Sequence, residues 1–116
     1  IKIAGKTSNE KKDLIKLALD AENAGAKCIL LECVSQNTAK EITSSVSVPT
    51  IGIGSSKFCD GQVLVFDDLI NIDINFKKPK FVKSYINFGN LAIKAVKNFN
   101  KDVKKGSFPS KKYSYK

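Results

Sequence analysis

The sequence is 116 residues long, which is typical of one domain, and 42% of its residues are hydrophobic, enough to form a buried core. The formal net charge is +9, but the basic residues are all lysines. Arginine is the residue favoured for bidentate contacts with bases and phosphates, so we expect no nucleic-acid partner. No apolar run reaches the roughly 20 residues that span a bilayer, and no basic-then-apolar leader is present, so we expect neither membrane insertion nor secretion.

The first predicted element is a helix over residues 8–24. Thr7 and Glu10 have the spacing of a capping box, and Gly25 stands where a helix end favours a left-handed residue. Between them, apolar residues recur at helical spacing on one face, at Leu14, Leu17, Ala18 and Ala21.

Two short apolar runs follow, at residues 28–31 and 50–54, separated by a predicted helix over 38–45. Both runs are apolar on both faces, which is typical of parallel strands covered by helices. Helix, strand, helix, strand with short connections predicts a parallel α/β sheet.

The rest of the chain is predicted to be helix and loop. Asp60 has the position of an N-cap, so a short helix is expected after it, and residues 71–80 form a polar loop. A final amphipathic helix ends at Gly106 and is followed by a basic tail over residues 107–116. Its apolar stripe consists of Phe88, Ala92, Ala95, Phe99 and Val103.

Glu32 is the leading candidate for catalysis because it ends an otherwise apolar strand. Side chains alternate along a strand, so Leu30 and Glu32 share one face while Leu31 and Cys33 share the other. In α/β barrels the strand ends carry the active site, where a carboxylate among apolar neighbours is a useful general base. A solvated or salt-bridged glutamate fits the same pattern, and the pattern alone leaves both open.

The loop Gly54-Ser55-Ser56 is a second candidate. Glycine after a strand lets a ligand approach the backbone, and a following helix N-terminus would favour phosphate. A tight turn that requires glycine explains the loop equally well. Three cysteines cannot all pair, their spacing fits no zinc signature and histidine is absent, so we expect reduced thiols, a cytoplasmic protein and no metal site within this chain.

Several stretches in order carry a resemblance to a known family: Leu30-Leu31-Glu32-Cys33-Val34, Val48-Pro49-Thr50-Ile51-Gly52-Ile53-Gly54, Cys59-Asp60-Gly61-Gln62-Val63-Leu64-Val65 and Gly106-Ser107-Phe108-Pro109. The chain resembles the C-terminal part of ketopantoate hydroxymethyltransferase, from just after the sixth strand of a (β/α)8 TIM barrel. The resemblance implies an α/β fold with the last two barrel strands, their helices and a C-terminal helix. Residues 1–106 would then be the C-terminal segment of a single, incomplete barrel domain, and 107–116 its tail.

The resemblance also implies an activity, namely hydroxymethyl transfer from 5,10-methylenetetrahydrofolate to α-ketoisovalerate, giving ketopantoate for pantothenate biosynthesis. It implies Glu32 as the proton acceptor and substrate contacts from Ile53, Val63 and Val65. It further implies Mg²⁺ held by residues outside this chain, a homo-oligomer that is a decamer in the family, and a chain that is inactive alone.

The sequence departs from the family at three places. Ser35 stands where the family usually has proline, Ser55-Ser56 stand where it usually has Ala-Gly, and the family's C-terminal histidine motif is replaced around Tyr113. Two alternative functions remain. One is a phosphate-binding TIM-barrel enzyme that uses Gly54-Ser55-Ser56, and the other is a small basic nucleic-acid-binding module.

Overall fold

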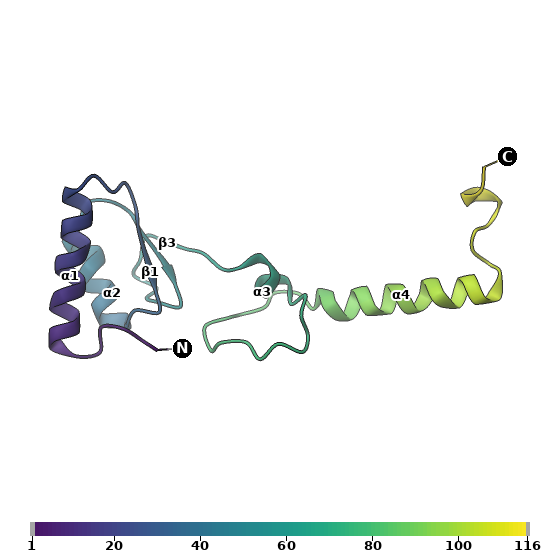
Figure 1. Cartoon of the computed structure of the whole chain (residues 1–116), viewed down its shortest axis with the longest axis horizontal. Coiled ribbons are helices and arrows are strands. Elements are labelled where there is room, and N and C mark those ends of the chain that lie inside the picture. Colours follow the sequence, from purple (N-terminus) through teal and green to yellow (C-terminus); the bar gives the residue numbers. More distant parts are fainter. Residues whose placement is uncertain (1, 116) are drawn as a thin grey trace. The chain divides into compact units, whose positions relative to one another are not determined.

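The computed structural model describes residues 2–115, which form two compact units (Figure 1). The first unit extends to Leu64 and also includes Pro79–Val82. The second contains Val65–Lys78 and the residues from Lys83 onward. Helices alternate with a small parallel sheet in the first unit, so the predicted α/β class is confirmed.

The first helix, α1, spans Ser8–Asn23 and begins as the capping box predicts. The Thr7 hydroxyl accepts the backbone N–H of Glu10 at 3.2 Å, and the Glu10 carboxylate accepts the backbone N–H groups of Lys6 and Thr7. Gly25 follows the helix end with φ +99°, a left-handed value that glycine adopts without strain. The predicted start and end of this helix are confirmed to within one residue.

The sheet has three parallel strands in the order β1-β2-β3, where two were predicted. Strand β1 spans Ile29–Glu32, β2 spans Thr50–Ile53 and β3 spans Gly61–Gln62. Helix α2, Gln36–Ser45, connects β1 to β2 and begins two residues before its predicted start. The prediction of only two strands is wrong. The third strand was missed because β3 is two residues long and includes a glycine, so its sequence has no recognisable strand pattern.

Asp60 does not cap a helix, which corrects a second prediction. Its carboxylate instead accepts the backbone N–H of Thr50 at 2.8 Å and the Thr50 hydroxyl at 3.2 Å. The residues that follow Asp60 pair with β2 as β3. Asp60 therefore contacts a residue ten positions earlier in the chain instead of capping a helix. Its carboxylate provides hydrogen-bond partners for the backbone N–H and the hydroxyl of Thr50, which is fully buried at the start of β2.

The hydrophobic core lies between the sheet and the two helices α1 and α2, which cover the same face of the strands (Figure 1). Leu31 points into this core and is 6% exposed, whereas its neighbour Leu30 is 58% exposed on the other face. The core residues are Ala18, Leu31, Val34, Ala39, Ile42 and Cys59. Within the described residues, the face of the sheet that carries Leu30 is therefore left uncovered.

The second unit contains α3, Phe66–Ile70, the long helix α4, Phe88–Lys105, and a short 3-10 turn at Lys111–Tyr113. Gly106 ends α4 with φ +69°, as predicted. The apolar stripe of α4 remains largely exposed within the described residues. Gly89, which lies outside the stripe, is the only residue of α4 that is buried. Within residues 2–115 no helix combines the length and apolar character required to cross a membrane.

Candidate active site at the strand ends

Glu32 is the last residue of β1, at the carboxyl end of the sheet. It pairs in register with Ile53 of β2, and Leu30 pairs with Ile51. Paired residues of parallel strands point to the same face, so these four side chains lie on the face that α1 and α2 leave uncovered. The Glu32 side chain is exposed and makes no hydrogen bond or ion pair with another described residue.

Glu32 also lines an apolar groove of about 370 Å³ along the free edge of β1. Leu17 and Ala21 of α1 and Leu30 of β1 contribute to its wall, and Glu32 is the only charged residue that lines it. The groove lies at an unpaired sheet edge, so it shows only that Glu32 stands next to apolar side chains of α1 and β1.

Two of the three predicted substrate contacts lie on the same face as Glu32. Ile53 is its cross-strand neighbour, and Gly61 pairs with Ile51. Val63 directly follows β3, and its N–H donates to the Gly52 carbonyl at 3.0 Å, which continues the pairing with β2 and, by strand alternation, places Val63 on the same face as Gly61. Val65 belongs to the second unit, directly before α3.

The turn that follows Glu32 has an unusual backbone. Cys33 is buried with φ +51°, a left-handed value that costs free energy in any residue with a side chain. Its N–H donates to the Ile53 carbonyl and its own carbonyl accepts the Ala4 N–H, both at 2.9 Å. Nothing in the sequence signals this turn, because cysteine has no preference for left-handed backbone.

The loop after β2 is held by its own side chains. Gly54 has φ +61°, and a Cβ at this position would lie 2.7 Å from the ring of Phe81, so only glycine fits. The Ser55 hydroxyl donates to the Leu31 carbonyl at 2.8 Å and accepts the Val34 N–H at 3.0 Å. Ser56 is buried and accepts the Phe58 N–H.

These contacts weaken the phosphate alternative. The hydroxyls of Ser55 and Ser56 are engaged by protein groups, and the loop leads into β3 rather than a helix N-terminus. Ser56 has no left-handed φ, so this position does not require the glycine that the family usually has. An open cavity of about 760 Å³ does adjoin the loop, lined by Gly54, Ser55, Gln62 and Phe81 among others.

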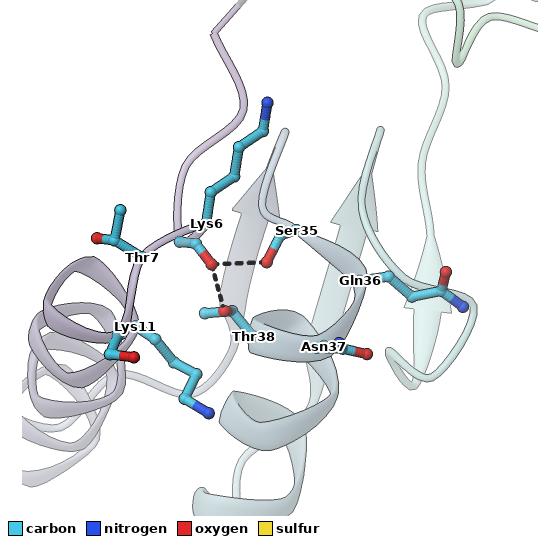
Figure 2. A pocket seen from close by; sticks show the side chains of 9 residues that line it. Lys6, Thr7, Lys11, Ser35, Gln36, Asn37 and Thr38 are labelled. Carbon is cyan, nitrogen blue, oxygen red and sulfur yellow. Dashed lines mark hydrogen bonds between the residues drawn. The ribbon is translucent and has the colours of Figure 1, made fainter.

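A second polar cavity, of about 410 Å³, lies between the starts of α1 and α2 (Figure 2). At its centre the Gly5 carbonyl accepts the hydroxyls of Ser35 at 2.8 Å and Thr38 at 2.7 Å. Lys11, on its wall, pairs with Glu41 at 2.8 Å. The hydroxyls in this cavity therefore attach the segment before α1 to the start of α2, beside the turn that follows Glu32.

The described residues do not form a magnesium site. Mg²⁺ requires about six oxygen ligands in near-octahedral geometry, usually with one or two carboxylates. No three histidine, cysteine, aspartate or glutamate side chains within residues 2–115 converge on a common point. The Asp60 carboxylate bonds Thr50 at the amino end of β2, away from the carboxyl ends of the strands, and Glu32 is the only acidic residue within β1, β2 and β3.

These features define the chain as part of an α/β protein with a candidate acid-base residue at the carboxyl ends of its strands. A family model described as ketopantoate hydroxymethyltransferase matches residues 1–111. The chain belongs to this family.

Similar proteins include the 3-methyl-2-oxobutanoate hydroxymethyltransferases of Thermosipho melanesiensis, Clostridium kluyveri and Thermotoga maritima. They are 45%, 48% and 46% identical to the chain over 115, 115 and 114 residues, which is 99%, 99% and 98% of its length. The chain spans only 43%, 41% and 42% of these relatives, respectively.

Proposed function

We propose that the full-length protein transfers a hydroxymethyl group from 5,10-methylenetetrahydrofolate to α-ketoisovalerate, with Glu32 as the proton acceptor. The family match over residues 1–111 carries this proposal, since the relatives are named for hydroxymethyl transfer to the same 2-oxo acid, 3-methyl-2-oxobutanoate. The position of Glu32 supports it, because this exposed carboxylate ends a parallel strand, and barrel enzymes place their catalytic groups at the carboxyl ends of the strands.

The proposed fold of the full-length protein is a (β/α)8 TIM barrel that contains this chain as its last three strands. Each strand is parallel to the next one in sequence, and the helices lie on one face only, as in a barrel wall. The uncovered face carries Leu30, Ile51 and Ile53, which would pack inside the barrel. Three of eight strands is about 38% of a barrel, close to the 43% of the Thermosipho relative that the chain spans.

In the proposed reaction the Glu32 carboxylate removes the proton from C3 of α-ketoisovalerate. The electron pair of the broken C–H bond forms the enolate, and C3 then forms a new bond to the one-carbon unit of the folate. The bonds from this carbon to N5 and N10 of the folate break, and one water molecule supplies the hydroxyl oxygen and its proton. The second proton of the water and the proton taken up by Glu32 go to the two nitrogens, so that ketopantoate and tetrahydrofolate are released. Ile53 and Val63 lie on the same face as Glu32 and would contact the two methyl groups of the substrate, with Val65 as a third proposed contact.

We propose that Mg²⁺ is held by residues that this chain does not contain, and the chain alone would then be inactive. The three cysteines are free thiols, which is consistent with the reducing cytoplasm that we propose as the location.

We also propose that the enzyme is a homo-oligomer in which α4 contacts another copy. The exposed apolar stripe and Val96 beside it support this, since Val96, Phe99 and Val103 are each about half exposed in the described chain. In the full-length protein, Val96→Glu should lower the oligomer mass measured by light scattering, whereas Asn90→Glu on the polar face should not. An unchanged mass for both variants would rule out this interface.

The function is tested by product formation in the full-length enzyme. Glu32→Gln should abolish folate-dependent conversion of α-ketoisovalerate to ketopantoate. Glu41→Gln, on the exposed side of α2, should retain it, because that glutamate makes only a surface ion pair with Lys11. Full activity of Glu32→Gln would refute the assignment. Heat protection by phosphate esters, and not by the 2-oxo acid with magnesium, would favour the phosphate-binding alternative.

A further inference from the structure

Ser55 connects the loop after β2 to both sides of Glu32. Its hydroxyl donates to the carbonyl of Leu31, the residue before Glu32, at 2.8 Å. The same oxygen accepts the N–H of Val34, two residues after Glu32, at 3.0 Å. The side chain is part-buried, so both bonds are partly shielded from water.

The segment between these two bonds is strained. Cys33 has φ +51°, and it would relax toward an ordinary backbone unless surrounding contacts held it. The Ser55 hydroxyl bridges this turn from Leu31 to Val34. Since Glu32 is the first residue inside the bridged segment, a change in the turn alters the direction in which its carboxylate points.

Ser55 stands where the family usually has alanine, and Ser35 stands where it usually has proline. Ser35 has φ −58°, close to the value that a proline ring would impose, so the backbone at this point keeps the family geometry without the ring. An alanine at position 55 can make neither hydrogen bond. The Ser55 hydroxyl therefore adds, in this chain, two hydrogen bonds across a turn that has no proline ring at position 35.

We propose that Ser55 is a positioning residue that holds Glu32 in the geometry required for proton abstraction. The kinetic part of this inference rests on the proposed function. Ser55 acts through the backbone of β1 and the turn after it, and its hydroxyl has no remaining donor for the substrate.

The test uses the full-length enzyme and the variant Ser55→Ala. We expect the rate of C3–H exchange of α-ketoisovalerate to fall roughly 10- to 100-fold, because displacement of a catalytic group by about 1 Å can cost this much. The KM for the 2-oxo acid should change little, since no substrate contact is removed. Ser55→Cys, which is nearly isosteric but a weaker donor and acceptor, should show a smaller loss and serves if Ser55→Ala does not fold.

Ser56→Ala is the matched control, because it removes a hydroxyl from the same loop that contacts Phe58 and not the Glu32 turn. An exchange rate in Ser55→Ala within about twofold of the starting protein, or an equal loss in Ser56→Ala, would overturn the inference.

A second measurement does not require activity. The ¹³C resonance of the Glu32 carboxyl carbon, assigned by its absence in Glu32→Gln, should shift or broaden in Ser55→Ala and stay unchanged in Ser56→Ala. If the starting protein catalyses no exchange but the resonance behaves this way, the proposed function is wrong and the positioning role of Ser55 stands. If exchange occurs and the resonance is unchanged in Ser55→Ala, the positioning role is wrong and the function stands.

Discussion

Replacing Leu30 by alanine in the full-length protein tests whether the uncovered face of the sheet is the inside of a barrel. Leu30 is 58% exposed in the described chain, and Leu31, on the helix-covered face, is 6% exposed. Removing a buried leucine side chain typically costs about 2–5 kcal/mol of unfolding free energy, whereas an exposed position costs about 0.5 kcal/mol or less. If upstream strands close the sheet, Leu30→Ala should cost about as much as Leu31→Ala.

The assay is urea unfolding of the two variants and the parent, followed by circular dichroism at one protein concentration, because oligomerisation shifts apparent stability. Leu31→Ala provides the internal reference, since its core contacts lie within the described chain. A cost below about 0.5 kcal/mol for Leu30→Ala, beside a large cost for Leu31→Ala, would show that this face remains in water and would refute barrel closure over it.

Three further predictions concern the stability of the described chain within the full-length protein. Ile42→Ala should lower the free energy of unfolding by about 2–5 kcal/mol in the same urea assay, because Ile42 is 1% exposed in the core. Gly54→Ala should cost about 1–3 kcal/mol more than Gly25→Ala, since both have left-handed φ values but only the new Cβ at position 54 would clash; equal costs would contradict this. Hydrogen bonds from the backbone N–H of Thr7 and of the residue before it lower the pKa of Glu10 below its ordinary 4.5, so its stabilising contribution is present above pH 4.5 and is lost as the pH falls through the lowered value. Urea titrations at neutral pH and in acid should therefore give a difference in unfolding free energy between the parent and Glu10→Gln that shrinks in acid. A difference that does not change with pH would contradict the lowered pKa of Glu10.

The elements that sequence patterns predicted correctly are those fixed by local interactions. The capping box of Thr7 and Glu10 and the left-handed Gly106 act within one helical turn, so spacing alone reveals them. The face shared by Leu30 and Glu32 also follows locally, from strand alternation.

The features that the sequence did not reveal depend on partners distant in the chain. Asp60 follows the local rule for a helix cap, but its carboxylate bonds Thr50 ten residues earlier. Strand β3 exists because β2 offers it hydrogen bonds, and its two residues carry no pattern of their own. Likewise, the bridge from Ser55 to the turn after Glu32 spans more than 20 residues of sequence, beyond the reach of spacing rules.

The most direct test of the proton-acceptor role of Glu32 is exchange of the C3 proton of α-ketoisovalerate in D₂O, measured by NMR on the full-length protein without folate. This isolates the proton-transfer step from carbon–carbon bond formation. We expect exchange in the parent protein and in Glu41→Gln, and its loss in Glu32→Gln. Undiminished exchange in Glu32→Gln would show that Glu32 is not the proton acceptor.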